Sequence, residues 1–214
     1  MLLRAAAGAP PPADGAVEVL PPLPGPVDAV LGFTAHSVVV AGVDPAAVRR
    51  RLPAGDLGAP LEAPFLTWLA DHLGGEPGSV DVVLAAPGLP GPTVPAAAGL
   101  ALRSRPDLAG HARVARAARF RREIRVLADD HERAVVLVGR GLAGRWELAF
   151  EVEPGSRNRG LGRALAFAAR GLVPAGEPLF AQAAPGNAAA LRAVLAAGFQ
   201  PVGSEVLFLR PVGA

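Results

Sequence analysis

The stretch Val152-Glu-Pro-Gly-Ser-Arg157-Asn-Arg-Gly160-Leu-Gly162-Arg163-Ala-Leu165 decides the fold of this chain. It follows a β-strand predicted over 145–152 and leads into a helix predicted over 158–171. Gly160 and Gly162 lie between the two, where a missing Cβ lets main-chain amides converge on a ligand. The start of a helix also offers free N–H groups and about half a positive charge. The stretch therefore predicts a diphosphate-binding loop.

Two other kinds of glycine-rich loop are excluded. A Walker loop ends in Gly-Lys-Ser/Thr, and this chain contains no lysine. A Rossmann fingerprint requires a third glycine or an alanine three residues after Gly162, where Leu165 stands. Arg157, Arg159 and Arg163 add positive charge around the predicted site.

The surrounding pattern predicts an α/β fold. Strands are predicted over 121–128, 134–139, 145–152, 178–182 and 199–209, and a second helix over 187–197. Three antiparallel strands followed by helix, strand, helix and strand are typical of one mixed sheet. Earlier in the chain, strands are predicted over 33–41 and 79–86, helices over 44–52 and 61–73, and a Pro/Gly-rich loop over 87–95.

Two motifs in this layout resemble the GCN5-related N-acetyltransferase (GNAT) family. Arg157-x-x-Gly160-x-Gly162 after a strand resembles the acetyl-CoA loop of the family, written Q/R-x-x-G-x-G/A. Asn187, followed eleven residues later by Gly198-Phe199, resembles the later motif of the family. The resemblance covers about residues 119–210. It implies a GNAT-like α/β fold, in which helices flank a mixed, mostly antiparallel central sheet.

The resemblance also implies a function and a binding site. Acetyl-CoA would be the co-substrate, and its acetyl group would pass directly to an amine on a small molecule or peptide. The implied cofactor-binding residues are Val152, Arg157, Asn158, Arg159, Gly160, Leu161, Gly162, Arg163 and Asn187. Main-chain amides of 158–163 would hold the pyrophosphate. The main chain at Val152 would pair with the pantetheine arm, where its strand splays from 180–182, and would polarise the thioester carbonyl. Asn187 would contact pantetheine, or serve as an ordinary helix N-cap, or do both.

The family's proton carriers are not matched. Val194 stands where many members have a tyrosine acid, and this chain has no tyrosine. Leu148 and Trp146 stand where members often have a carboxylate or histidine base. A β-bulge could turn Glu147 inward as the catalytic base, whereas the alternative is a solvated strand face. The alternative function is therefore a catalytically degenerate acyl-CoA sensor or scaffold protein.

The amino-acid composition limits which partners, metals and membrane segments the chain could have. All 21 basic residues are arginine and the net charge is only +2, so the alkaline isoelectric point does not indicate a nucleic-acid partner. The chain has no cysteine, its four histidines lack metal-ligand spacing, and no apolar run reaches the roughly 20 residues of a membrane helix. We therefore expect a cytoplasmic protein without a metal.

Three segments are expected. Residues 1–28 are rich in proline, alanine and glycine and predict a flexible arm, which could also embrace a second copy in a homodimer. Residues 29–118 would supply the acceptor-side wall of the acyltransferase fold. Residues 119–214 would form the acetyl-CoA-binding core.

Overall fold

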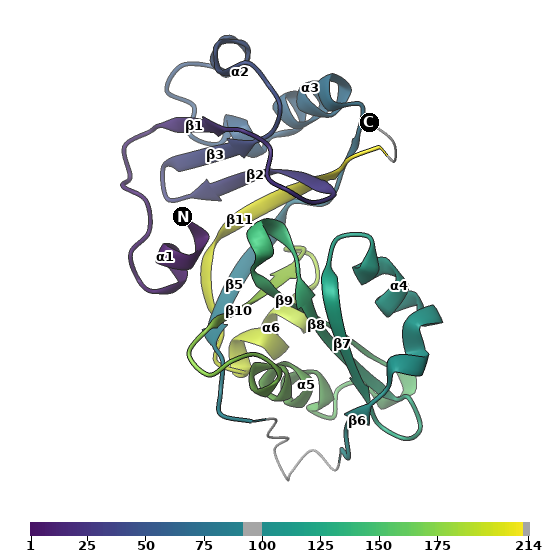
Figure 1. Cartoon of the computed structure of the whole chain (residues 1–214). Helices are drawn as coiled ribbons and strands as arrows, with labels where there is room; N and C mark the ends of the chain where they lie inside the picture. Colours follow the sequence, from purple (N-terminus) through teal and green to yellow (C-terminus); the bar gives the residue numbers. More distant parts are fainter. Residues whose placement is uncertain (92–99, 212–214) are drawn as a thin grey trace. The chain divides into compact units, whose positions relative to one another are not determined.

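A computed structural model describes residues 1–91 and 100–211 (Figure 1). The chain divides into two compact units, Met1–Val83 with Val202–Ala214, and Leu84–Pro201. Each unit contains helices and a mixed, mostly antiparallel set of strands, which confirms the predicted α/β class. The loop predicted over 87–95 extends into residues 92–99, which lie outside the described part of the chain.

The first unit builds its sheet from β1, β3, β2 and β11. β1 runs parallel to β3, and β2 is antiparallel to both β3 and β11. The bounds are α1 Leu2–Ala6, β1 Val17–Leu20, β2 Val27–Phe33, β3 His36–Val40, α2 Pro45–Arg51, α3 Ala63–Leu73, β4 Glu76–Pro77 and β11 Gln200–Leu209. The core includes Phe65 and Leu69 of α3, packed with Val30, Val39 and Val206 of the strands.

Local sequence explains the helices of this unit. The Asp44 carboxylate accepts a hydrogen bond from the Ala46 amide at 3.0 Å, and Pro45 occupies the first turn of α2, as predicted. α3 ends at Gly74, whose φ of 63° is left-handed. The strand predicted over 33–41 is shorter than expected because Ala35, at φ 48°, turns the chain between β2 and β3.

The segment predicted as a flexible arm contains regular structure instead. β1 lies along β3, and the Gly15 amide donates to the Ala35 carbonyl at 2.7 Å. His36 Nδ1 lies 2.9 Å from the Asp14 carboxylate, which fastens the residues before β1 to β3. The physical reason is local composition: Val-Glu-Val-Leu at 17–20 alternates and contains no proline, so it can pair with a strand edge that would otherwise lack partners.

The second unit contains the predicted core strands. Their order is β10-β9-β8-β7-β6; β10 and β9 are parallel and the other pairs are antiparallel. The bounds are β5 Asp81–Pro87, β6 Arg103–Ser104, α4 Ala112–Ala118, β7 Arg122–Ala128, β8 Ala134–Arg140, β9 Trp146–Val152, α5 Leu161–Ala169, β10 Pro178–Ala183 and α6 Ala188–Ala196. The unit boundary falls inside β5 and β11, which differs from the division expected at 118/119, because the latter part of β11 pairs with β2.

Helices cover the two faces of the strands of the second unit (Figure 1). Val114 and Ala117 of α4 pack on one face against Val126, Leu137 and Ala149. α5 packs against β8 and β9 on the other face, and α6 packs against α5. Along these strands, successive side chains therefore alternate between the sheet face that α4 covers and the sheet face that α5 covers.

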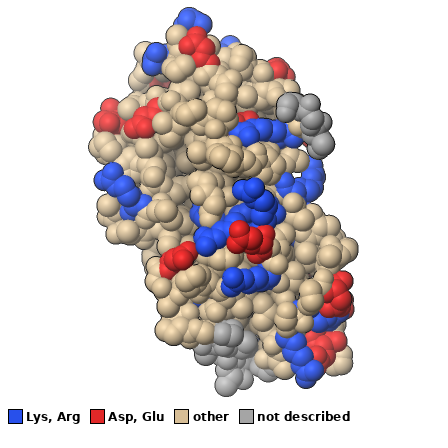
Figure 2. Space-filling model, viewed as in Figure 1, with Lys and Arg blue, Asp and Glu red and all other residues tan. Residues whose placement is uncertain are grey.

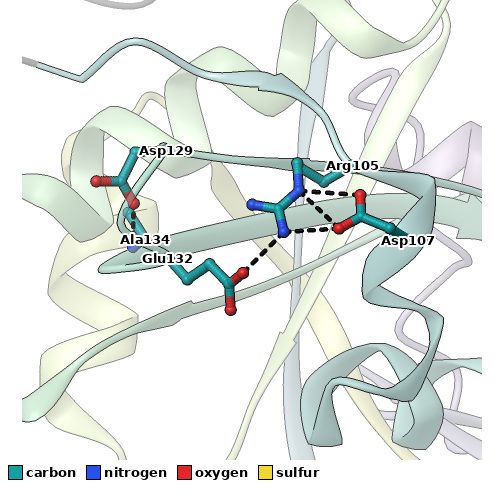
Figure 3. Close-up of polar contacts among 5 residues, drawn as sticks. All are labelled: Arg105, Asp107, Asp129, Glu132 and Ala134. Carbon is teal, nitrogen blue, oxygen red and sulfur yellow. Dashed lines mark hydrogen bonds and ion pairs between the residues drawn. The ribbon is translucent and has the colours of Figure 1, made fainter.

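A polar cluster fastens the turn between β7 and β8 (Figure 3). The Arg105 guanidinium donates to the carboxylates of Asp107 and Glu132, each through a contact of 2.7 Å. Asp107 and then Glu132 raise the pKa of Arg105, and Arg105 lowers the pKa of Asp107. Asp129 accepts from the Ala134 amide at 3.0 Å and so closes the turn. The contacts of Arg105 are solvent-exposed, whereas the bond to Asp129 is buried, and we assign all of them a local ordering role.

Charged groups are distributed rather than gathered on the face drawn in Figure 2, where arginine and acidic side chains are interspersed among uncharged ones. This agrees with the small net charge of +2. Every helix in the described part of the chain falls short of the length and apolarity needed to cross a bilayer.

Candidate functional site

The loop between β9 and α5 presents a run of free main-chain donors. Asn158 has φ 60° and Gly160 has φ 78°, and α5 begins at Leu161 without a side-chain cap. The N–H groups of residues 158–163 make no hydrogen bond within the part of the chain that the structure describes. The next amide, that of Ala164, donates to the Gly160 carbonyl at 3.1 Å. Six consecutive donors and the positive end of the α5 dipole are thus available to an anion.

The two loop glycines are needed for different reasons. A Cβ at Gly160 would meet nothing within 4 Å, so that position requires glycine for its left-handed φ. A Cβ at Gly162 would lie 3.3 Å from Phe150 Cε2 and 3.3 Å from Ala193 Cβ. Gly162 therefore permits close packing of α5 against β9 and α6, a reason that the motif alone does not reveal.

The three arginines of the loop are differently engaged. Arg157 donates from Nε to the Val152 carbonyl at 3.1 Å, across the end of β9. Arg159 and Arg163 are exposed, and neither makes an ion pair or a side-chain hydrogen bond with another described residue. Both side chains are therefore free to reorient toward an anion near the loop.

Pairing between β9 and β10 stops halfway along β9. The parallel register joins Trp146, Glu147 and Leu148 to Leu179, Phe180 and Ala181. The remaining residues of β9, 149–152, pair with β8 on their other side but have no partner in β10 among the described pairs. This leaves an unpaired β9 edge that leads to the free amides of the loop. The separation begins beyond Ala181, near the 180–182 segment expected from the sequence.

Asn187 follows β10 and begins α6. Its side-chain oxygen accepts from the Ala190 amide at 3.1 Å, so Asn187 is an N-cap, one of the two roles expected. The oxygen is used in this contact, and the side-chain NH₂ group remains a donor for a ligand carbonyl.

Glu147 is fully buried, with 0% of its surface exposed, so the alternative of a solvated strand face does not apply to it. One carboxylate oxygen accepts from Arg145 Nε at 2.8 Å and from the Leu142 amide at 3.2 Å. The other accepts from Arg121 Nε at 2.8 Å. The β8–β9 register is continuous through Glu147, so no bulge turns it inward.

The pKa of Glu147 lies below its ordinary value of 4.5. Burial is the largest influence and raises the pKa, but the charges of Arg145 and Arg121 and the hydrogen bonds that they donate together outweigh it. Glu147 is therefore a carboxylate held between two guanidinium groups, which makes it a weak proton acceptor.

Two residues beside Glu147 were not anticipated from the sequence. Arg121 bridges Glu147 to Gln182, because its Nη2 donates to the Gln182 side-chain oxygen at 3.0 Å. Gln182 follows the last residue of β10 that pairs with β9. Gln182 belongs to no recognisable motif, and Arg121 is one of several arginines within a few residues of one another, so neither residue stands out in the sequence. Because residues i and i+2 of a β-strand lie on the same face of the sheet, the spacing of Phe180 and Gln182 is the one sequence signal that places them on a common face.

The positions of the family's proton carriers hold apolar side chains in the core. Val194, at the tyrosine position, is 2% exposed, and Leu148 is 3% exposed. Trp146 is also buried; its indole N–H donates to the Glu177 carboxylate at 3.0 Å, and the Arg140 guanidinium lies 3.8 Å from its ring centroid. Within the described residues, no group of three or more His, Asp or Glu side chains could hold a metal ion.

Comparisons with known proteins bear on this geometry. No protein-family model matches the chain, and no curated protein matches it. A GCN5-related N-acetyltransferase from Kribbella flavida is similar over 89% of both chains, with 21% identity and a TM-score of 0.47. A GNAT acetyltransferase from Colwellia psychrerythraea is 12% identical over 70% of this chain and 63% of its own, with a TM-score of 0.39.

A tandem GNAT protein from the clavulanic acid biosynthesis pathway is 16% identical over 87% of this chain and 65% of its own, with a TM-score of 0.43. All three solved structures are GNAT proteins.

Proposed function

We propose that this chain is an acetyl-CoA-dependent N-acetyltransferase of the GNAT family that transfers an acetyl group to an amine on a small molecule or peptide. One observation carries the proposal: an unpaired β9 edge leads directly to six free amides and two free arginines. A strand edge can bind an extended amide-containing arm, and a helix start can bind a diphosphate. Coenzyme A contains these two chemical parts in this order.

The binding roles follow from the positions of the residues. The amides of 158–163 would hold the diphosphate, with Arg159 and Arg163 supplying charge. Arg157 would either turn toward the diphosphate, as Arg159 and Arg163 do, or keep its hydrogen bond to the Val152 carbonyl. The main chain of Val152 would pair with pantetheine, and the Asn187 NH₂ group would donate to one of its carbonyls.

The reaction requires few protein groups. The neutral amine nitrogen attacks the thioester carbonyl carbon, the C–N bond forms, and the C–S bond breaks to release the thiolate of coenzyme A. The amine loses one proton and the thiolate gains one, so the products are an amide and a thiol. We expect solvent to carry both protons, because the chain has no tyrosine and because Glu147 is engaged by two arginines. A general-base role for Glu147 stays a prediction that can be tested.

Thermal unfolding with and without acetyl-CoA tests the binding part of the proposal. A ligand at 100 times its Kd adds about 2.7 kcal/mol to the free energy of unfolding. For a chain of this length that corresponds to a melting temperature about 5–10 °C higher. The control ligand is adenosine, which lacks the diphosphate and pantetheine. An unchanged melting temperature with millimolar acetyl-CoA would contradict the proposal.

Release of the free thiol of coenzyme A tests catalysis. Acetyl-CoA is incubated with the protein and a panel of primary amines, and the background is thioester hydrolysis without amine. Amine-dependent thiol release with formation of the acetylated amine supports the enzyme. Confirmed binding with no turnover on any amine would instead indicate the sensor or scaffold alternative.

A further inference from the structure

Gln182 has an unusual position at the point where β9 and β10 stop pairing. The parallel register of β9 and β10 ends with the pair Leu148 and Ala181, and Gln182 is the next residue of β10. Phe180 is registered with Glu147, so Gln182, two residues later, lies on the same face of the sheet as Glu147. Continued pairing would have placed Ala149 opposite Gln182. The small side chain of Ala149 fills little of the space on that face.

The orientation of the Gln182 amide is fixed by chemistry. Its contact with Arg121 Nη2 measures 3.0 Å, and a guanidinium group can only donate. The atom that faces Arg121 is therefore the amide oxygen, and the NH₂ group is directed elsewhere. Nε2 of Gln182 is buried and finds no hydrogen-bond partner among the described residues. A buried donor without a partner is costly, so an acceptor that reaches Nε2 would stabilise it.

A chain of ion pairs holds this donor in place. Arg121 donates from Nε to the buried Glu147 carboxylate while its Nη2 holds Gln182. Glu147 is held in turn by Arg145 and by the Leu142 amide. Because Arg121 is bonded to the buried Glu147 carboxylate at 2.8 Å and donates to the Gln182 oxygen at 3.0 Å, the Gln182 amide has little freedom to rotate.

We propose that Nε2 of Gln182 donates a hydrogen bond to a carbonyl oxygen of the acyl-pantetheine arm that binds along the unpaired edge of β9. Arg121 and Glu147 are positioning residues that aim this donor. The inference rests on the proposed function, because it takes acetyl-CoA as the ligand. Two carbonyl sources share this chemistry: the thioester carbonyl of the acyl group and the amide carbonyls of pantetheine.

Calorimetric titration of acetyl-CoA and of coenzyme A into variants of Gln182 tests the proposal. Gln182→Met preserves side-chain length but removes the donor. Gln182→Glu keeps an oxygen for Arg121 and also removes the donor. Gln200→Met is the matched control, because Gln200 is the only other glutamine and is exposed. We expect both Gln182 variants to bind acetyl-CoA about 5- to 15-fold more weakly, the loss of one hydrogen bond, and the control to bind normally.

The two ligands distinguish the two carbonyl sources. A donor to the thioester carbonyl predicts weaker binding of acetyl-CoA with unchanged binding of coenzyme A. A donor to a pantetheine carbonyl predicts equal losses for both ligands. Unchanged affinities in Gln182→Met and Gln182→Glu would overturn the proposal and leave solvent as the partner of Nε2. Wild-type protein that binds neither ligand would instead overturn the proposed function itself.

Arg121→Lys tests the positioning role. Lysine keeps a positive charge beside Glu147 but lacks the planar fork that reaches Glu147 and Gln182 together. We expect this variant to reproduce the ligand-specific loss of Gln182→Met. A loss of thermal stability with wild-type affinities for both ligands would show that Arg121 is only structural, and it would remove the positioning role.

Discussion

Gly162 of α5 lies so close to Phe150 of β9 that a Cβ on the glycine would stand 3.3 Å from Phe150 Cε2. The same Cβ would stand 3.3 Å from the Cβ of Ala193 on α6. The glycine motif thus serves two needs at positions two residues apart: Gly160 lets the backbone turn, and Gly162 lets three elements approach one another. A substitution at either position changes the molecule in a different way.

Gly162→Val is expected to lower the free energy of unfolding by about 1–3 kcal/mol, because the added methyl groups overpack the contact with Phe150 and Ala193. Gly160→Ala is expected to cost about 1 kcal/mol through its left-handed φ alone, since open space surrounds that position. Urea unfolding of the two variants and the wild type measures both effects. A Gly162→Val protein as stable as the wild type would contradict the packing role.

Arg163→Ala is expected to weaken acetyl-CoA binding by about 1–3 kcal/mol, or about 5- to 150-fold, the range for a hydrogen bond to a charged group. The physical reason is that Arg163 stands in the first turn of α5 without an ion-pair partner among the described residues. Arg192→Ala on α6 is the matched control, because Arg192 is also exposed and, among the residues that the structure describes, its side chain bonds only the Ala188 carbonyl of its own helix. Titration calorimetry measures both; equal effects would indicate nonspecific charge attraction.

Most elements of the second unit could be predicted because their signals are local. The alternation of β8 and β9 and the turn glycines between them predicted those strands within two residues at either end. α5 starts at Leu161 rather than at 158 because Asn158 and Gly160 adopt left-handed backbone, which a hydrophobic pattern does not encode. α4 was not predicted, because five of its seven residues are alanine or valine and the other two are arginine, which gives little periodic contrast.

Long-range contacts account for what sequence reasoning missed at the site. In the strand expected from the sequence, the alternation of side chains placed Glu147 on a solvated face. Arg121, which bonds it, lies 26 residues before it, and Gln182, which Arg121 also bonds, lies 35 residues after it. Their meeting depends on the registers of β9 with β8 and β10, which no local motif specifies. The N-terminal segment was mispredicted for the same reason, because the partner of β1 is a strand edge that forms only in the fold.

Glu147→Gln is expected to destabilise the protein by about 3–5 kcal/mol at pH 7, because it removes the buried negative charge to which the guanidinium groups of Arg121 and Arg145 donate. The folded-state pKa of Glu147 is below 4.5, so its stabilising contribution is present above that value and is lost as the pH falls through the folded-state pKa. The wild type should therefore approach the variant in stability as the pH is lowered below about 4.5. Urea unfolding at pH 7, 5 and 3.5 measures the difference, and a pH-independent difference would contradict the ion-pair assignment.

The pH dependence of acetyl transfer is expected to follow the amine rather than the protein. The chain contains no lysine, tyrosine or cysteine, so no side chain has an ordinary pKa between about 8 and 11. With solvent as the proton acceptor, kcat/KM should rise tenfold per pH unit below the pKa of the amine and reach a plateau above it, with no descending limb.

Two amines that differ in pKa by about two units separate the mechanisms, because the inflection should move with the amine. An inflection that stays at one pH for both amines would identify a residue of the protein as the base.

Glu147→Gln completes this test: a general base contributes about 10²- to 10⁴-fold in rate. Because the substitution also destabilises the fold, the rate is measured at a temperature where the variant is folded, and is compared with Arg121→Lys, which keeps the carboxylate. A large rate loss in Glu147→Gln alone would restore Glu147 as the base, whereas similar small losses in both would confine it to positioning Arg121 and Gln182.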